Sequence, residues 1–394
     1  MIPVTGYSVD GFSRFEDRLL LLMRRHGVPG MQAALSINGE IVYDRGFGFS
    51  DLESMTEVEP ESRFRVASLA KPITSAAVFR LVEMGLLDMD GGVLDLLSDL
   101  APCGGRIIDK RWHNLKVRHL LEHSGGFDRE LHGDPQFDWY EQAASAMQEK
   151  SPASARTLVR YAMTQPLAFE PGSRFCYSNL GYNILGRVIE KVSGKSYEQF
   201  VRKEIGLRSG IVSMAIGRTE AGSRLDGEVR YYERPCLFTD KEVIAQASPL
   251  ARSLLRSGPP EVELPYGASF VIESMDSHGG WIMRASDMVR FVCALEGKGD
   301  RQMLLENKSI RSMVEPPGFA SGQTEYYSSG WLVRSSLDRW SHNGALVSST
   351  GAVIIRLAPG TALCVLCNHL PPDWRRFLDI SLQTGLPQSL GKII

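Results

Sequence analysis

Residues 68–72 (sequence SLAKP) combine a hydroxyl nucleophile with an amine three residues later. Apolar residues recur at three- and four-residue intervals over 73–87, which predicts a helix with a wide buried face. Lys71 should then lie one turn from Ser68 on the same side of that helix. A serine hydroxyl needs a nearby base, and a desolvated lysine with a lowered pKa can supply one. We therefore interpret Ser68 as a candidate nucleophile and Lys71 as its base.

The S-x-x-K spacing is not specific by itself, because a chain of this length should contain it about once or twice by chance. A second match at 389–392 follows Pro387 near the end of the sequence. The first match is distinguished by its place at the start of a predicted helix. Pro72 is tolerated there, and unpaired backbone N–H groups of the helix terminus lie beside the serine.

A second group consists of Tyr177 and Asn179, in a Y-x-N sequence between a turn at 169–172 and an apolar helix predicted from Leu180. We expect both side chains on one side of the loop, with Ser178 pointing away. A tyrosine near two cations can shift toward phenolate and act as a base, and an asparagine offers a donor and an acceptor to a substrate amide. An isolated Y-x-N is more often a loop tyrosine followed by a helix cap.

A third group is the sequence HNG at 342–344, directly before a strand predicted over 345–357. A glycine at this point would let a ligand approach the strand edge. The backbone N–H of Ala345 could then join that of Ser68 in an oxyanion hole. Alone, His342 would more often be a surface histidine than a catalytic one.

The elements that must position these groups are strands near both ends of the chain, with helices between them. The predicted helices cover 12–26, 73–87, 117–122, 153–164, 180–192, 287–295 (capped by Ser286) and a last one from Pro372. The predicted strands cover 31–37 and 40–46, joined by an Asn38-Gly39 hairpin, and then 330–334, 345–357 and 362–368. Residues 210–280 show little periodicity apart from a strand-like run at 228–233.

This order of elements indicates an α+β fold, an α/β sandwich in which one antiparallel sheet is built from both chain termini and flanked by helices. A mostly helical insertion should pack beside the sheet. We expect 1–70 and 310–394 to form the sheet domain and 71–309 the helical domain. The active site should lie in the cleft between them.

Composition excludes several other classes of function. The chain has 394 residues, 43% of them hydrophobic and 23% charged, with a net charge of -2. Such a chain has no electrostatic attraction for nucleic acid or an anionic membrane. Residues 1–11 lack a basic n-region and the apolar run 19–23 is short, so we expect a cytoplasmic protein without a membrane span.

The cysteines indicate neither a disulfide framework nor a metal site. Two of the six form a lone C-x-x-C at 364–367 inside an apolar, strand-like run, with no second pair to complete a zinc site. In a reducing compartment they are most simply buried thiols. We expect no metal and no cofactor. The six are Cys103, Cys176, Cys236, Cys293, Cys364 and Cys367.

Taken together, the three groups resemble the serine β-lactamase and penicillin-recognising superfamily, specifically its class C-like branch with family VIII-type esterases and D-aminopeptidases. Members carry S-x-x-K, then Y-x-N, then K-T-G or H-x-G on a late strand. This chain has 68–71, 177–179 and 342–344 in that order. The resemblance covers most of residues 20–370. Further similar segments lie at 117–126, 169–172, 279–280 with 286–287, and 329–331.

The resemblance implies a β-lactamase/transpeptidase-like fold and a set of residue roles. Ser68 would be the nucleophile, and Lys71 and Tyr177 would share the base and acid work. The N–H groups of Ser68 and Ala345 would bind the oxyanion. The residues implied to contact substrate are Asn179, His342, Asn343, Gly344 and Trp331.

Two departures from the family pattern bear on substrate choice. His342 stands where the β-lactamases have a lysine, so the positive charge near neutral pH should be weaker. That favours esters or uncharged amides over penicillins. The sequence HSGG at 123–126 replaces the commoner H-T-S-G, a change without a clear functional consequence.

We expect a serine hydrolase that forms an acyl-enzyme on Ser68 and cleaves a small ester or amide. An alternative is an acyltransferase that passes the same acyl group to an alcohol or amine, since the choice depends on water access and an acceptor pocket. Further alternatives are a β-lactamase or D-amino-acid peptidase, and a homologue that only binds a ligand. Trp281, Tyr326 and Tyr327 could shape the pocket or belong to the core. The natural substrate and the oligomeric state do not follow from the sequence.

Overall fold

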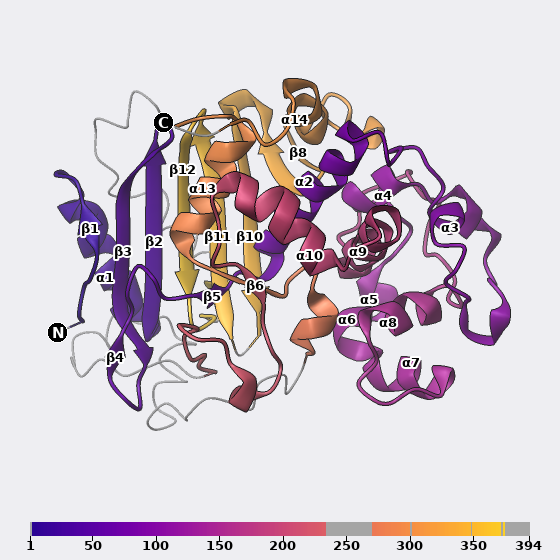
Figure 1. Ribbon diagram of the computed structural model, residues 1–394, viewed down its shortest axis with the longest axis horizontal. Helices are drawn as coiled ribbons and strands as arrows, with labels where there is room; N and C mark the ends of the chain where they lie inside the picture. Colours follow the sequence, from indigo (N-terminus) through magenta and orange to yellow (C-terminus); the bar gives the residue numbers. More distant parts are fainter. Residues whose placement is uncertain (1, 234–269, 300–301, 348, 372, 375–394) are drawn as a thin grey trace.

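The computed structural model describes residues 2–233, 270–299, 302–347, 349–371 and 373–374. Within these residues the largest sheet has nine strands, in the order β1-β3-β2-β12-β11-β10-β9-β8, with β4 paired to β3 (Figure 1). All of its neighbouring strands run antiparallel. Its strands are β1 (Tyr7–Ser8), β2 (Gly30–Ile37), β3 (Glu40–Asp51), β4 (Thr56–Glu57), β8 (Glu325–Ser328), β9 (Trp331–Arg334), β10 (Arg339–Leu346), β11 (Thr350–Ala358) and β12 (Thr361–Cys367).

A second, small sheet lies beside the first in the order β5-β7-β6. It joins β5 (Phe64–Arg65), which precedes the candidate nucleophile, to β7 (Trp281–Met283) and β6 (Ala215–Ile216). The strand that leads to Ser68 therefore pairs with β7, which lies more than 200 residues later in the sequence and pairs in turn with β6.

The helices separate into those on the sheet and those that form the other half of the molecule (Figure 1). Helices α1 (Ser13–His26) and α13 (Ala285–Leu295) pack on the large sheet, and α2 (Ala70–Glu83) lies between the two halves. Helix α14 (Asn307–Val314) lies near β8 and contacts α2 (Figure 1). The remaining α-helices of the described residues are α3 (Val93–Leu96), α4 (Val117–Leu121), α5 (Arg129–His132), α6 (Pro135–Asp138), α7 (Tyr140–Met147), α8 (Ala155–Ala162), α9 (Asn179–Ser193) and α10 (Tyr197–Val201).

Strand alternation gives the large sheet two buried faces. On β2, Ala33 and Leu35 pack in the cluster with α1, whereas Ala34 packs in the cluster with α13. On β12, Cys364 and Cys367 likewise fall in opposite clusters, because residues three apart on a strand point to opposite faces. The C-x-x-C sequence therefore cannot act as a local thiol pair.

The predicted architecture is confirmed: β2 from the amino-terminal part pairs with β12 from the carboxyl-terminal part, with Leu35 opposite Leu363. The Asn38-Gly39 hairpin also forms, with φ of 52° and 93° at the two residues. Helix α1 ends at Gly27, which takes the left-handed conformation with φ 64°. These features depend on local chemistry that the sequence displays directly.

Three predictions of elements were wrong. The strand predicted over 345–357 is two strands, β10 and β11, because the chain reverses between Leu346 and Thr350 without glycine or proline. Residues 228–233 form isolated bridges at Glu228 and Tyr232 instead of a strand. Helix α13 begins before Ser286, and the Asp287 carboxylate accepts a hydrogen bond from the Arg284 N–H at its start.

Some predictions fall outside the described residues or stay predictions. The helix predicted from Pro372 lies almost wholly outside them, as does Cys236. The division into 1–70 with 310–394 and 71–309 stays a prediction. Helix α13, from the middle segment, packs against the sheet through residues such as Val289 and Val292. Across the residues that the structure describes, no helix is both long and apolar enough to cross a membrane.

Candidate active site

Ser68 lies in a short 3-10 turn, Ala67–Leu69, that runs directly into α2. Ala67 has φ 49°, a left-handed conformation that an alanine seldom adopts and that costs on the order of 1–3 kcal/mol. The Val66 N–H donates to the Trp281 carbonyl at 3.0 Å and fixes the segment before the turn. The strained residue thus sits directly before the nucleophile, where it sets the direction of the chain that carries Ser68.

Gly344 on β10 allows this turn to lie close to the sheet. A Cβ at Gly344 would come within 2.7 Å of the Val66 carbonyl oxygen and 3.1 Å of the Ala67 Cβ. We expected this glycine to admit a ligand, but the structure shows that it admits the chain that carries the nucleophile. Gly344 therefore shapes the site through backbone packing.

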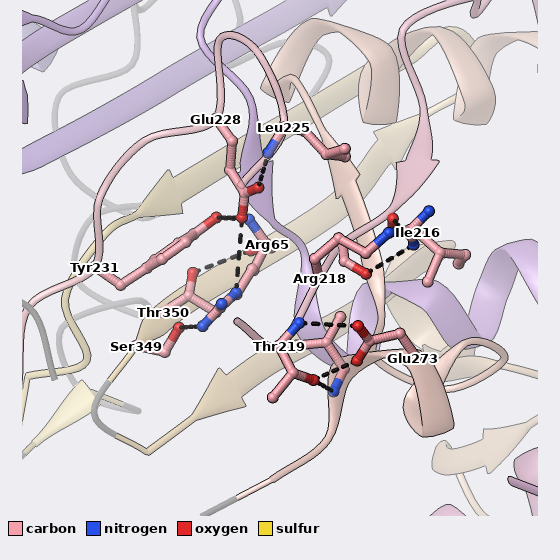
Figure 2. A network of polar contacts seen from close by, with 12 residues as sticks. Arg65, Ile216, Arg218, Thr219, Leu225, Glu228, Tyr231, Glu273, Ser349 and Thr350 are labelled. Carbon is pink, nitrogen blue, oxygen red and sulfur yellow. Dashed lines mark hydrogen bonds and ion pairs between the residues drawn. The ribbon is translucent and has the colours of Figure 1, made fainter. Parts of the chain in front are cut away.

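A buried polar network anchors β5, the strand before the turn (Figure 2). The Arg65 Nε lies 3.9 Å from a Glu228 carboxylate oxygen, and both side chains are buried. The Tyr231 hydroxyl accepts from the Arg65 N–H at 2.8 Å and donates to Glu228 at 3.2 Å. Arg65 also donates to Ser349 at 2.9 Å, and Thr350 donates to the Arg65 carbonyl at 3.0 Å. Three separate segments are thereby joined next to the site.

Lys71 is fully buried in the first turn of α2, with its Nζ 3.0 Å from the Ser68 Oγ. The same Nζ lies 2.8 Å from the Asn179 Oδ1 and 3.1 Å from the His278 carbonyl oxygen. Those two oxygens can only accept, so they use both N–H bonds of a neutral amine. The remaining lone pair then faces the Ser68 hydroxyl, which is the arrangement a base requires.

The surroundings of Lys71 favour that neutral form. Burial lowers the pKa of Lys71 well below its usual value, the nearby Arg129 lowers it further, and Asp134 raises it. Desolvation is the largest of these influences. The Ser68–Lys71 distance and the lowered pKa of Lys71 thus both agree with the predicted pairing of nucleophile and base.

Tyr177 brings a second group to the nucleophile, because its hydroxyl lies 3.0 Å from the Ser68 Oγ. Two cations do lie near its ring, with the Lys71 Nζ 4.8 Å and the Arg129 Cζ 5.3 Å from the centroid. Burial nevertheless raises the pKa of Tyr177 above that of a free tyrosine. The phenolate that we expected from the two cations is therefore disfavoured, and the geometry suits a phenol that donates its proton.

Asn179, the first residue of α9, links Lys71 to a buried acid. Its Oδ1 accepts from Lys71, and its Nδ2 donates to the Asp134 Oδ2 at 2.7 Å. The second Asp134 oxygen accepts from the Gln136 N–H at 3.1 Å. The Ser178 Oγ turns away and accepts from the Gly181 N–H at 3.3 Å, which caps the helix. The amide of Asn179 is thus committed at both ends to positioning the lysine.

His342 lines the cavity as a neutral imidazole. Its Nδ1 donates to the Asn343 carbonyl at 2.7 Å, which leaves Nε2 to accept from the Tyr327 hydroxyl at 3.1 Å. Burial, with a further contribution from Lys71, lowers the pKa of His342 to about 3. The weak positive charge expected here is in fact absent at neutral pH, because the ring is buried.

His123 supports the loop that carries Tyr177. It is buried with φ 54°, and its Nδ1 accepts from the Ser178 N–H at 3.1 Å. Its ring centroid lies 4.3 Å from that of Tyr177 and 4.6 Å from that of Tyr327. Burial holds the pKa of His123 well below its usual value, so this histidine also packs as a neutral ring.

These groups open onto one cavity of about 770 Å³. Its lining includes most of the predicted site, namely the polar residues Ser68, Tyr177, Asn179, His342 and Asn343 together with Ala345. The apolar lining includes Phe137, Phe270, Met275, Leu332, Leu346 and Trp374. Both Ser68 and Ala345 line the cavity. That their backbone N–H groups form the oxyanion hole stays a prediction.

Trp331, like Gly344, is a predicted substrate contact that does not line the cavity. It is fully buried on β9, and its ring packs at a centroid distance of 6.2 Å from Trp340. Trp281 is also fully buried, and its Nε1 donates to Tyr197 at 3.1 Å. Of the aromatic residues considered for the pocket, Tyr327 lines it.

Sequence reasoning missed three contributors: Asp134, His278 and Arg129. Asp134 precedes a proline and caps α6, so its sequence context indicates only a helix start. His278 acts on Lys71 through its backbone carbonyl, which no residue type reveals. Arg129 lies in a loop-like segment without periodicity and is placed in the cavity only by the fold.

Comparison with known proteins gives one family and a common fold. The sequence model of the family Beta-lactamase matches residues 15–384. Penicillin-binding protein 4* of Bacillus subtilis (strain 168) is 26% identical over 318 residues, which span 79% of this chain and 60% of that protein. Esterase EstB of Burkholderia gladioli is 29% identical over 226 residues, which span 53% of this chain and 54% of that esterase.

Solved structures extend the likeness over nearly the whole chain. A D-amino acid amidase from Ochrobactrum anthropi SV3 has a TM-score of 0.67 at 21% identity, covering 94% of this chain and 98% of that one. EstCE1, described as a hydrolase with promiscuous acyltransferase activity, has a TM-score of 0.67 at 19% identity. The match covers 93% of this chain and 96% of EstCE1. These likenesses establish the shared fold, whereas the sequence matches span 60% or less of the two curated relatives.

Proposed function

Since this chain belongs to the Beta-lactamase family, we propose that it is a serine hydrolase that forms an acyl-enzyme on Ser68 and cleaves a small ester or amide. One observation carries the proposal. The Lys71 Nζ and the Tyr177 hydroxyl each lie 3.0 Å from the Ser68 Oγ, one suited to accept a proton and the other to donate one.

Acylation would begin when Ser68 transfers its proton to the neutral Lys71 amine and its Oγ attacks the substrate carbonyl. The resulting oxyanion would take hydrogen bonds from the N–H groups of Ser68 and Ala345. The Tyr177 hydroxyl would give its proton to the departing alcohol or amine, and the Lys71 ammonium would return a proton to Tyr177. The two products are then a released leaving group and an acyl ester on Ser68.

Deacylation would run the same proton transfers in reverse, with water in place of the leaving group. Water loses a proton toward Tyr177 and Lys71, adds to the acyl carbonyl, and the Ser68 oxygen leaves with a proton from Lys71. Asn179 holds Lys71 in place throughout with its Oδ1 at 2.8 Å from the Nζ, and Asp134 holds Asn179 by accepting from its Nδ2 at 2.7 Å.

The cavity supports an ester or amide substrate rather than a penicillin. His342 is neutral, so β10 lacks a charge of the kind that a lysine would present to a carboxylate. Phe137, Phe270 and Leu332 add an apolar wall that can take a hydrocarbon or aromatic acyl group. Two relatives of the chain are named as an esterase and a penicillin-binding protein, so activity has to decide between these substrates.

The acyltransferase alternative is favoured by the size of the cavity. About 770 Å³ is larger than a short acyl chain fills, which leaves room for an alcohol or amine beside the acyl-enzyme. The likeness to EstCE1 is in keeping with this alternative. Both reactions share the acyl-serine and differ only in the second substrate.

Turnover of a substrate panel tests the proposal. The purified protein should hydrolyse short-chain p-nitrophenyl esters faster than nitrocefin, and Ser68→Ala should reduce the rate to background. Adding methanol or butanol would reveal transfer if the alkyl ester of the acyl group accumulates at the expense of the free acid. Preferred hydrolysis of nitrocefin would overturn the assignment of substrate, and activity that survives in Ser68→Ala would overturn the mechanism.

A further inference from the structure

Arg129 is a fixed positive charge that faces the active-site cavity. It begins α5, is exposed to solvent, and lines the same cavity as Ser68 and Tyr177. Its guanidinium carbon lies 5.3 Å from the centre of the Tyr177 ring. Beyond its effect on the pKa of Lys71, the proposed mechanism gives this side chain no contact with substrate, although it lies beside the residue that would protonate the leaving group.

The acids around Arg129 are engaged elsewhere. Its neighbour Asp128 pairs with Arg174 at 3.1 Å and accepts from the Glu130 N–H at 3.1 Å. Asp138, which also lines the cavity, accepts from the Asp134 N–H at 2.6 Å. Within the described ranges, Arg129 has no ion pair or hydrogen bond to a side chain. Its five N–H donors are therefore available to a ligand.

The other basic groups in and behind the cavity are neutral or committed. His342 and His278 are buried, and burial lowers the pKa of each ring. The His278 Nε2 contacts the Gln136 Oε1 at 3.0 Å. Lys71 is enclosed behind Ser68 and makes three contacts of its own. Among the described lining residues, Arg129 is thus the one permanent cation.

We propose that Arg129 binds a carboxylate of the substrate, so that the preferred esters or amides carry an anionic group close to the scissile bond. A guanidinium binds a carboxylate through two parallel N–H bonds, and this geometry also fixes the orientation of the substrate. The positive charge would thus lie on α5, beside Tyr177, and not at position 342 on β10, where the β-lactamases have a lysine. This inference rests on the proposed function and names its substrate class.

Two pairs of matched esters test this proposal, one for each side of the scissile bond. In the acyl pair, mono-p-nitrophenyl adipate is compared with p-nitrophenyl 6-methylheptanoate, in which an uncharged isopropyl group replaces the carboxylate. In the leaving-group pair, 3-carboxyphenyl butyrate is compared with phenyl butyrate. For each pair the readout is the ratio of kcat/KM for the anionic ester to kcat/KM for the neutral ester.

In Arg129→Gln this ratio should fall about 5- to 20-fold in at least one pair, as expected for the loss of a partly exposed, charge-assisted contact. Arg129→Glu should lower it further through like-charge repulsion. Arg25→Gln is the matched control, since Arg25 is exposed on α1 on the other side of the sheet. Circular dichroism and the midpoint of thermal unfolding establish that each variant is folded.

The outcomes separate this inference from the proposed function. If the wild-type protein hydrolyses these esters and neither ratio changes in Arg129→Gln or Arg129→Glu, the carboxylate site is refuted while the hydrolase stands. An equal loss for charged and neutral esters also refutes it, because Arg129 would then act through Tyr177 or through folding. If the wild-type protein hydrolyses no ester at all, the proposed function itself fails.

Discussion

Replacing Tyr177 with phenylalanine should slow the reaction far more for poor leaving groups than for good ones. The Tyr177 hydroxyl lies 3.0 Å from the Ser68 Oγ, and burial raises the pKa of the phenol, which therefore keeps its proton at neutral pH. An alkoxide leaves only with a proton, whereas p-nitrophenolate departs as a stable anion. The variant removes the donor and leaves the ring in place.

The two losses differ in size because they measure different interactions. For an ethyl ester, loss of general-acid catalysis should cost about 10²- to 10⁴-fold in kcat/KM, which corresponds to roughly 3–5 kcal/mol in the barrier. For a p-nitrophenyl ester, only the hydrogen bond to Ser68 is lost, about 0.5–1.5 kcal/mol or roughly 2- to 13-fold.

A series of acetate esters with leaving groups of increasing basicity provides the assay. The logarithm of kcat/KM, plotted against leaving-group pKa, should fall more steeply for Tyr177→Phe than for the wild-type protein. Tyr182→Phe is the control, because the Tyr182 hydroxyl is buried nearby but donates to the Leu121 carbonyl at 2.9 Å. Parallel lines for the wild-type protein and Tyr177→Phe would refute the role of Tyr177 as the acid.

Three further perturbations follow from the same contacts. In a pH profile, kcat/KM should rise with pH through the lowered pKa of Lys71, well below that of a free lysine, because only the neutral amine can accept a proton. Gly344→Ala should lower kcat/KM and cost about 1–3 kcal/mol in urea unfolding, since its Cβ would lie 2.7 Å from the Val66 oxygen. Glu228→Ala should cost about 3–5 kcal/mol in urea unfolding by removing the carboxylate that faces the buried Arg65, and Glu228→Gln less.

Each of these three predictions could be contradicted by a specific result. An acid limb near the pKa of a free lysine would mean that Lys71 is not the neutral base. If Gly344→Ala kept wild-type stability and activity, β10 would not pack as closely on the turn Ala67–Leu69 as the structure indicates. Equal unfolding free energies for wild type and Glu228→Ala would remove the network in Figure 2 as a support of the site.

The parts of the fold that could be predicted from sequence are those fixed by local chemistry. The hairpin at 38–39, the end of α1 at Gly27 and the start of the helix after Ser68 each follow from residues with restricted backbone preferences. The pairing of the two termini in one sheet followed from the order of the elements. The chain reversal between Leu346 and Thr350 was missed because the sequence between them lacks such residues.

The sequence could predict only those residues of the candidate site whose side chains take part in the chemistry, and not a backbone contact such as that of the His278 carbonyl. Ser68, Lys71, Tyr177 and Asn179 were identified by type and spacing, and the structure brings them together. The protonation states of Tyr177 and His342 could not be predicted, because burial decides the pKa of both side chains.

Two other residues show the same limit: one was predicted at the site but lies elsewhere, and the other lies at the site but was not predicted. Trp331 was expected at the substrate, but strand alternation turns its ring into the core beside Trp340. Asp134 was not expected at all, because its contact with Asn179 at 2.7 Å joins residues that are 45 positions apart. Neither fact is visible in the spacing of motifs.

The measurement that tests the central claim most directly is covalent labelling by a fluorophosphonate, read by intact mass and then by peptide mapping. We predict a single adduct on the peptide that contains Ser68, absent in Ser68→Ala and strongly slowed in Lys71→Ala. An adduct on Ser389, the other serine with S-x-x-K spacing, or ester hydrolysis that continues in Ser68→Ala, would contradict the account.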